Sequence, residues 1–509
     1  MLRSGCETER KFEAGAGDLL PVLRGMPGLG DQIGPQQQVL EATYYDTRDL
    51  RLARGGITLR RRSGGDDAGW HLKLPRGDDN RDELRVPLDD GATARGVPTE
   101  LEELVRARSR GAKLRPVALI TTRRCSWRLA DGTGEPVVEV VDDHVTAHTL
   151  GSQTTAESWR EIEVELIGHG KPKLLDRLER RLGAAGIRRS NSASKLARLL
   201  GDRLPVRTVP PAVDARSSAG CVVLAYLGRQ ADEIIRYDPL VRQQVPDAVH
   251  QMRVATRRMR SAVQVFSKVI ERDQARRLAA ELKWLAGVLG PARDLEVLQE
   301  RFAQATAALP TEEVVGPVQQ RFTRYFARPE AAAADEVRAA LASRRYFALL
   351  NDIEAVLTTP SLTSRGRRSA RRELPRLIRR VDGKVARRMQ HADQQRPGAS
   401  RDTALHEVRK AAKRLRYATE AARPVFGKPA NRFRKRVKTL QRLLGEHHDA
   451  VVTRPVLRKI GMQAHLDGEN GYTFGLLHGQ QGARINTVEE KLPPAWRRLR
   501  GSKRRRWFG

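Results

Sequence analysis

Cysteine and aromatic residues are scarce in this chain, and long apolar runs are absent. Its 509 residues include three cysteines, Cys6, Cys125 and Cys221, and 5% aromatic residues. Three isolated thiols without a CxxC pair exclude a disulfide framework and a thiolate zinc site, and they favour a reducing, cytoplasmic location. No apolar run approaches the roughly 20 residues that span a bilayer, and the first residues lack a secretory signal. We therefore expect no association with membranes.

Acidic residues are also few relative to basic ones, and the imbalance is uneven along the chain. The chain has 94 Lys and Arg against 61 Asp and Glu, which gives a formal net charge of +33. Residues 1–200 hold 33 basic and 30 acidic side chains, so residues 201–509 carry almost the whole excess, +30. A positive field of this size attracts polyanions before any specific contact forms. The length and the charge distribution together predict at least two domains with different chemistry.

Hydrophobic periodicity changes near residue 200. Residues 1–200 read as short alternating segments separated by SGGDD, RGDD and DGTGE, which predicts an antiparallel sheet interrupted by helices around 98–108 and 171–186. Residues 201–216 contain Pro205, Pro210 and Pro211 and are interpreted as a linker. Residues 217–500 have helical periodicity and predict an all-α domain. The basic tail 501–509 is interpreted as a frayed end, with an electrostatic arm as the alternative.

The helical region contains an internal repeat. HQMRVATRRMR at 250–260 matches HEVRKAAKRLR at 406–416, and each copy is followed by an LGxxxD segment, LGPARD at 289–294 and LGEHHD at 444–449. The distance from the first histidine to the last aspartate is 44 positions in one copy and 43 in the other. Agreement in both residues and spacing predicts two copies of one helical unit.

Each copy places four basic or histidine side chains on one face of a helix, away from the apolar positions. They are His250, Arg253, Arg257 and Arg260 in the first copy and His406, Arg409, Lys413 and Arg416 in the second. Like charges on one face repel each other unless a polyanion covers them, so the faces favour phosphate binding. A solvated face, or metal ligation by the two histidines, is the alternative. DNA is a rival partner, but few aromatic or base-reading side chains accompany the stripes, so a linear polyphosphate fits better than a specific nucleic acid.

The double H-x-x-R-x-x-x-[RK]-R-x-R motif, with LGxxxD after each copy, resembles the CHAD domain. The resemblance covers about residues 215–500 and implies an all-helical domain of two related four-helix units associated with inorganic polyphosphate. It implies a basic groove or pore that binds polyphosphate and could direct the chain to polyphosphate granules. The residues implied are His250, Arg253, Arg257, Arg258, Arg260, His406, Arg409, Lys413, Arg414 and Arg416.

Alternating charged side chains mark the strand-like segments of the first region. Glu7, Glu9 and Lys11 project to one side of a strand. The same arrangement recurs in Arg60 with Arg62, His71 with Lys73, Arg81 with Glu83 and Arg85, Glu139 with Asp143, and Glu161 with Glu163 and Glu165. Carboxylates that hold Mg²⁺ or Mn²⁺, beside Lys and Arg that bind phosphates, suit metal-dependent phosphate transfer. A sheet with one solvated face is the alternative, although the acidic and basic residues are separated among the strands.

The ExExK motif, followed in order by YYDTRDLRLARGGITLRRR, LKLP, EIEVEL and SNSASKLARLL, resembles the CYTH domain of the triphosphate tunnel metalloenzymes. The resemblance covers about residues 3–200 and implies an eight-stranded antiparallel tunnel that hydrolyses a triphosphate or, in some members, cyclises ATP. It implies metal ligation by Glu7, Glu9, Glu163 and Glu165, together with Glu139 and Asp143. It implies phosphate binding by Lys11, Arg60, Arg62, Lys73, Arg85, Arg124 and Lys195, with Glu9 and Lys11 as the catalytic pair.

Two positions remain open because a shift of one residue in a strand reverses its faces. Either Arg123 or Arg124 could face inward, and Asp143 is preferred over Asp142 because it shares the parity of Glu139. The leading hypothesis is a Mg²⁺- or Mn²⁺-dependent triphosphatase acting on inorganic triphosphate, joined to a polyphosphate-binding domain; thiamine triphosphate and ATP remain open as substrates. The alternatives are a polyphosphate-binding protein without catalysis, an adenylyl cyclase, and a nonspecific nucleic-acid-binding protein.

Overall fold

The computed structural model describes residues 3–77, 79–88, 96–151, 154–204, 212–501 and 505–508. The chain divides into two compact units, Met1–Thr208 and Val209–Gly509, and each is described by itself. The division falls inside the predicted linker 201–216, whose prolines at 205, 210 and 211 lie outside the described residues. Across the described ranges, no helix is long and apolar enough to cross a membrane.

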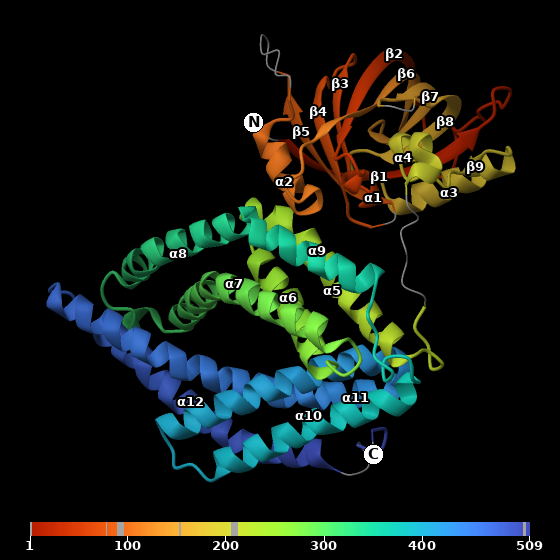
Figure 1. Cartoon of the computed structure of the whole chain (residues 1–509). Helices are drawn as coiled ribbons and strands as arrows, with labels where there is room; N and C mark the ends of the chain where they lie inside the picture. The colour runs from red at the N-terminus through yellow and green to blue at the C-terminus, as the bar shows by residue number, and fades with distance from the viewer. Residues whose placement is uncertain are drawn as a thin grey trace. The chain divides into compact units, whose positions relative to one another are not determined.

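Unit 1 is a closed antiparallel barrel (Figure 1). Its strands are β1 (Arg3–Ala14), β2 (Gln32–Asp46), β3 (Thr58–Ser63), β4 (Gly69–Pro75), β5 (Asn80–Pro87), β6 (Arg115–Ala130), β7 (Pro136–Thr149) and β8 (Ala156–Leu166). They pair in the order β5-β4-β3-β2-β6-β7-β8-β1, and a β1–β5 pairing closes the ring, while the short β9 (Arg188–Arg189) pairs with β1. This confirms the predicted eight-stranded tunnel.

Two regions of the outer face of the barrel are apolar and covered by helices. The helices of this unit are α1 (Arg51–Arg54), α2 (Thr99–Ser109), α3 (Pro172–Ala184) and α4 (Lys195–Leu200). Leucines of α2 pack on Leu59, Trp70 and Leu84 of β3 to β5, and leucines of α3 pack on Val138 and Val164 of β7 and β8. Because side chains alternate along a strand, the residues between these positions must point into the barrel.

α4 is different, because it packs against inward-facing residues. Leu196, Leu199 and Leu200 contact Tyr44 of β2, Val145 of β7 and other side chains in a buried apolar cluster. Val145 shares the parity of Asp143 and Glu139, which face the lumen. α4 therefore fills one end of the barrel and brings its first residue, Lys195, to the interior. Ser194 caps this helix by accepting a hydrogen bond from the backbone N–H of residue 197.

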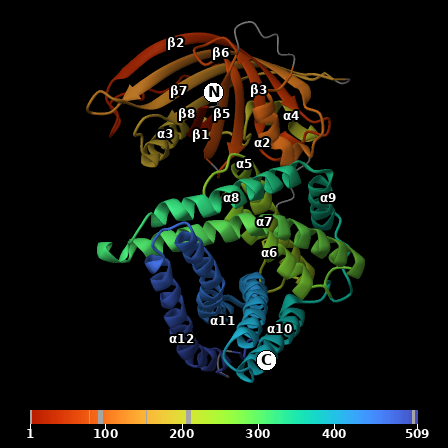
Figure 2. The same ribbon diagram turned by 90° about the vertical axis from the view of Figure 1, so that its left-hand side faces the viewer.

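Unit 2 is helical and contains the predicted repeat. Its helices are α5 (Ala219–Arg242), α6 (Ala248–Val265), α7 (Arg272–Ala307), α8 (Val318–Ala342), α9 (Arg344–Thr358), α10 (Ala370–Asp393), α11 (Ala399–Leu466) and α12 (Tyr472–Arg500). α11 is two helices joined at Gly427, whose φ of 56° is in the left-handed region. The two four-helix units are then α5 to α8 and α10 to α12, with α9 between them, and Figure 2 shows α10, α11 and α12 side by side.

The C-terminal residues 505–508 are packed, so the interpretation of the whole tail as a frayed end is wrong for them. Phe508 is 1% exposed and lies 5.0 Å from the ring of Phe433. Its carbonyl oxygen accepts hydrogen bonds from Arg379, and Arg505 forms an ion pair with the buried Asp382. The pair of Phe508 and Phe433 explains why the tail is packed, because burying two large rings stabilises it. The basic residues of the tail, taken alone, predict a solvated segment. Residues 502–504 and 509 lie outside the described residues.

Candidate functional site

The inward faces of the barrel strands converge on one polar cavity. Every residue that the tunnel resemblance implied lines it except Asp143, which is fully buried directly behind it. The lining residues are Glu7, Glu9, Lys11, Arg60, Arg62, Lys73, Arg85, Arg124, Glu139, Glu163, Glu165 and Lys195, with Tyr44, Thr58, Asp67, Arg81, Glu83 and Ser194. Arg124 points inward and Arg123 is exposed, while Asp142 pairs with Arg160 and leaves Asp143 to the interior.

Three carboxylates form a row across neighbouring strands. In the strand register Glu165 of β8 lies opposite Glu9 of β1 on one side and opposite Glu139 of β7 on the other. Like charges at directly opposed positions repel. Burial, together with the carboxylates of Glu7, Glu9 and Glu163, raises the pKa of Glu165 to about 8. Glu139 lies 3.4 Å from Arg128 and Glu9 lies 3.3 Å from Lys11, whereas Glu165, in the middle of the row, makes no hydrogen bond or ion pair with any residue of the described ranges.

Glu9 has part of its charge balanced. Burial opposes its ionisation, but Lys11 and Lys73 outweigh this effect and lower the pKa of Glu9 to about 2. Its Oε2 lies 3.3 Å from Lys11 Nζ, whereas its buried Oε1 has no hydrogen-bond partner in the described structure. Glu7 is similar, since it pairs with Lys73 and lies 3.5 Å from Arg85. Within the row, Glu9 Oε1, which lies 3.8 Å from Arg81, and the carboxylate of Glu165 are therefore left without a hydrogen bond from a described residue.

Deeper in the barrel, an ammonium group occupies a cage of carboxylates. Lys195 Nζ lies 2.8 Å from Asp143, 2.8 Å from Glu161 and 2.7 Å from Glu163. Burial opposes the charge of Lys195, but the three carboxylates outweigh it and raise its pKa well above the usual value. The same three acidic residues are close enough together to hold a metal ion. In this structure Lys195 supplies the cation, so an additional ion fits better in the row of Glu9, Glu165 and Glu139.

Three guanidinium groups of β3 and β6 also line the cavity, and one of them, Arg124, hydrogen-bonds to Asp143 and Glu163. Arg60 and Arg62 come from β3 and Arg124 from β6. Burial and the charges of Arg60 and Arg124 lower the pKa of Arg62 to about 9. Arg60 and Arg62 each have a buried Nε without a hydrogen-bond partner in the described part of the chain, although Arg62 pairs with Asp67 and Arg60 donates to Tyr44 at 3.2 Å. An anion among these groups would relieve their repulsion.

Sequence reasoning left several lining residues without a role. Arg81 and Glu83 share the parity of Arg85, so strand alternation places them on the inner face. Glu83 Oε1 lies 2.9 Å from Nδ1 of the buried His71, and the Glu83 carboxylate also contacts Lys73 and Arg85. Tyr44 and Ser194 carry no charge signal in the sequence; the strand register places Tyr44 opposite Arg60, and Ser194 reaches the cavity as the N-cap of α4.

A second cavity lies within unit 2, between α6, α7 and both halves of α11. Of the residues implied for polyphosphate, those that line it are His250, Arg253, Arg257, His406, Arg409, Lys413 and Arg416. Arg258, Arg260 and Arg414 do not line it. The cavity also receives Arg293 and Arg301 from α7, which the repeat motif did not single out. We call this cavity the helical pocket.

The repeat produces the same ion pair twice in the helical pocket. Arg253 Nη1 lies 2.8 Å from Asp294 Oδ1, and Arg409 Nη2 lies 3.7 Å from Asp449 Oδ1. The last residue of each LGxxxD segment thus orients the first arginine of its own motif. These two carboxylates do not balance the pocket, because burial together with Arg257 and the other arginines lowers the pKa of Lys413 to about 6.

The three histidines of the second repeat have two different environments: His406 and His448 contact each other, and His447 contacts carboxylates. His406 Nδ1 lies 3.1 Å from His448 Nδ1, and burial together with Arg409 lowers the pKa of His448 to about 3. Neither His250 nor His406 belongs to a group of three possible metal ligands among the described residues. His447, buried nearby, does belong to one, since its Nε2 lies 3.2 Å from Glu489 and 3.4 Å from Asp402.

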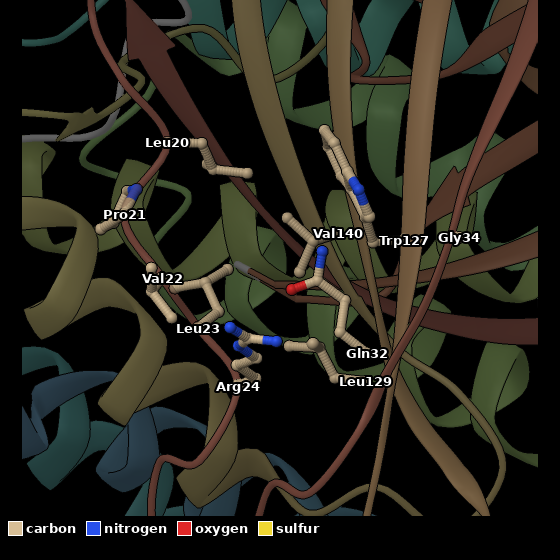
Figure 3. Close-up of a pocket in the computed structure, with 10 residues that line it drawn as sticks. All are labelled: Leu20, Pro21, Val22, Leu23, Arg24, Gln32, Gly34, Trp127, Leu129 and Val140. Carbon is tan, nitrogen blue, oxygen red and sulfur yellow. The ribbon is translucent and has the colours of Figure 1, made fainter.

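An apolar hollow lies on the other face of the barrel wall. Figure 3 shows its ten lining residues, which come from the segment between β1 and β2 and from β2, β6 and β7. Val140 neighbours Glu139 in β7 and therefore points away from the tunnel. Arg24 is the one charged residue among the ten. This hollow therefore lacks the charges needed for phosphate chemistry.

Comparison with known proteins gives matches to both units. A profile of the CYTH domain matches residues 6–200, and a profile of the CHAD domain matches residues 225–458. The uncharacterized proteins MT2285 and Rv2226 of two Mycobacterium tuberculosis strains are 37% identical to the chain, covering 97% of it and 96% of each relative. Among solved structures, PptA from Streptomyces chartreusis is 19% identical (TM-score 0.46; 55% of this chain, 100% of that chain). The CHAD domain from the plant Ricinus communis is 24% identical (TM-score 0.44; 57% of this chain, 96% of that chain).

Proposed function

The chain belongs to the family in which a CYTH domain is followed by a CHAD domain, and from this premise we propose that it is a metal-dependent triphosphatase with a polyphosphate-binding domain. The substrate we propose for the barrel is inorganic triphosphate or a related linear triphosphate. The ligand we propose for the helical pocket is inorganic polyphosphate, which would also direct the protein to polyphosphate granules.

One observation carries the proposal for the barrel, namely two opposite electrostatic defects in one cavity. The pKa of Glu165 is raised to about 8 by burial and neighbouring carboxylates, and the pKa of Arg62 is lowered to about 9 by burial and neighbouring arginines. A divalent cation relieves the first defect, and a polyanion relieves the second. A complex of Mg²⁺ or Mn²⁺ with a triphosphate supplies both charges in one ligand.

The residues of the barrel would divide the work of binding and catalysis. Glu9, Glu165 and Glu7 would hold the ion, with Glu139 beside them; the ion, when bound, neutralises phosphate charge and helps to orient the attacking water. Arg60, Arg62 and Arg124 would bind the phosphates, and Lys73 and Arg85 would neutralise their outer charges. Lys11, which contacts Glu9 and Glu163, would stabilise charge that develops on the reacting phosphate.

Release of phosphate from inorganic triphosphate, ATP and thiamine triphosphate, with Mg²⁺ or Mn²⁺, tests the proposal. We compare the wild-type protein with Glu9→Gln and with Glu135→Gln, an exposed glutamate in the turn between β6 and β7. We expect metal-dependent turnover that Glu9→Gln abolishes and Glu135→Gln preserves. Turnover of none of the three substrates would reject the hydrolase. Formation of cyclic AMP from ATP, measured in the same reactions, would instead establish a cyclase.

The proposal for the helical pocket rests on its unbalanced positive charge. Eight Lys and Arg side chains line the pocket against Asp294 and Asp449. We expect fluorescently labelled polyphosphate to bind the full chain, and Arg257→Gln to weaken binding more than Arg338→Gln, an exposed arginine of α8 outside the pocket. Equal competition by duplex DNA and unlabelled polyphosphate would show a nonspecific polyanion site instead.

A further inference from the structure

The exposed face of α10 carries a row of cations outside the helical pocket. The row consists of Arg372, Arg376, Arg380, Lys384 and Arg387, all exposed, at positions i, i+4, i+8, i+12 and i+15 of the helix. It extends over about 22 Å at 1.5 Å per residue. Arg376 lies 3.7 Å from the buried Glu373, and the other four form no ion pair with any described residue. We call this row the α10 ridge.

The helix α10 has three acidic residues, of which two are buried and the third, the exposed Asp393, stands six positions after the last ridge residue. Glu373 and Asp382 are each 1% exposed, and Asp382 pairs with Arg500 and Arg505. Like charges four residues apart on a helix destabilise it by roughly 0.2 to 0.5 kcal/mol per pair. The ridge therefore weakens the isolated helix, and the pair of Arg376 with Glu373 is its one ion pair with a described residue.

The equivalent helix of the first repeat shows that the fold does not require these cations. α5 and α10 both follow an N-cap serine, Ser218 and Ser369, and the two serines form a β-bridge with each other. Counting from these caps, the ridge positions correspond to Cys221, Ala225, Arg229, Glu233 and Arg236 in α5. There the charges are mixed, and Arg236 pairs with Glu233 at 2.7 Å. The ridge is thus a feature that distinguishes the second repeat.

Some arginines of α6 and α11 that do not line the helical pocket interact electrostatically with an arginine of α10. Arg260 of α6 and Arg414 of α11 do not line the pocket. The pKa of Arg260 is lowered mainly by burial and, to a smaller extent, by the positive charge of Arg414. Arg388 of α10 acts on Arg414 in the same way, and its own guanidinium lies 3.3 Å from Glu407. Arg387 of the ridge is the neighbour of Arg388 in the chain. The arginines of α6 and α11 outside the pocket are therefore coupled electrostatically to Arg388 of α10, which is next to the ridge residue Arg387 in the chain.

We propose that the α10 ridge is a second polyphosphate-binding surface, which takes the part of a long chain that extends beyond the helical pocket. This inference rests on the proposed polyphosphate binding by that pocket. A chain with more phosphates than the pocket's eight Lys and Arg residues must place the excess charge elsewhere. A linear row of exposed cations without aromatic residues suits a flexible phosphate chain, which offers no bases for stacking.

Chain length separates the two surfaces in an experiment. We compare the wild-type protein with the triple variant Arg372→Gln/Arg376→Gln/Arg380→Gln and with a charge-matched control, Arg277→Gln/Arg328→Gln/Arg338→Gln. The control positions are exposed residues of α7 and α8. The probes are fluorescently labelled polyphosphates, one with no more than eight phosphates and one many times longer, titrated at several salt concentrations. Circular dichroism and thermal melting verify that both variants fold like the wild type.

The ridge variant should lose affinity for the long chain by about ten- to a hundredfold, and the slope of log K against log salt should fall by about two to three. Its affinity for the short chain should stay within the change seen for the control. Equal losses for both chain lengths, or equal losses in the ridge variant and the control, would overturn the proposal. Duplex DNA that competes at the ridge as well as long polyphosphate would also overturn it. Failure of the wild-type protein to bind either length would instead reject the pocket's proposed function.

Discussion

Glu165 provides a quantitative link between metal binding and pH. Burial and the neighbouring Glu7, Glu9 and Glu163 raise its pKa to about 8 in the metal-free protein. At pH 6.5 the carboxyl group is therefore about 97% protonated, and at pH 9 only about a tenth of it is. A carboxylate must lose its proton to bind a cation. Metal binding should thus release close to one proton at pH 6.5 and about 0.1 proton at pH 9.

The sign of the pH dependence follows from the raised pKa. The free protein binds more protons than the metal complex below pH 8, so acid favours the free protein. Metal affinity should rise by about tenfold per pH unit up to about pH 8 and then level off. Glu165→Gln removes the titrating group, and it should remove both the proton release and this slope.

Isothermal titration of the full chain with Mn²⁺, in two buffers of different ionisation enthalpy, measures the released protons. Glu135→Gln is the matched control, because this exposed carboxylate lies outside the cavity. Subtracting the Glu165→Gln titration isolates the barrel from other carboxylates, including the group around His447 in unit 2. Release near zero at pH 6.5 in the wild type, or unchanged release in Glu165→Gln, would refute the reasoning.

Three further predictions address the other features of the two units. Arg62→Gln should raise KM for triphosphate by about ten- to a hundredfold, because a charged hydrogen bond to the substrate is lost. Its melting temperature should stay unchanged or rise, because the repulsion among the guanidinium groups is relieved. Steady-state kinetics that show an unaltered KM would contradict this prediction. Lys413, with a pKa of about 6 from burial and nearby arginines, should take up a proton when polyphosphate binds at pH 7.5, so affinity should rise as pH falls; Lys413→Met should remove the uptake, which titration in two buffers measures. Leu196→Ala should cost about 2 to 5 kcal/mol and release Lys195 from its cage, with lower activity and an earlier barrel transition in thermal melting; an unchanged melt would show that α4 does not hold the barrel end.

Strand alternation made most of the tunnel predictable, because the period of two fixes which side chains share a face. ExExK alone places Glu7, Glu9 and Lys11 together. Register could not be read in the same way, so the choice between Arg123 and Arg124 needed the pairing of Arg124 with Asp143. The cage around Lys195 joins residues far apart in sequence, and only the folded barrel brings them to one point.

Helical periodicity was less informative in unit 2. It gives the angle of a side chain around the helix, but it does not say how far neighbouring helices enclose that face. Arg416 lines the pocket, whereas its counterpart Arg260 does not, although both stand at the same place in the repeat. The α10 ridge was not predicted from the sequence, because the repeat motif includes only residues 250–260 and 406–416 and no residue of α10. The aromatic packing of Phe508 was hidden by the charges around it.

α4 gives the barrel a direction. Its leucines occupy the lumen at one end, and its first residue, Lys195, pairs there with the fully buried Asp143. A linear anion that enters at the other end would meet this apolar cluster, so it would not thread through the barrel and be cut at an interior bond while both ends remain outside. The barrel should therefore cleave a phosphate chain at a fixed distance from its terminus. A long polymer would be shortened from its end, and its products would leave by the opening through which it entered.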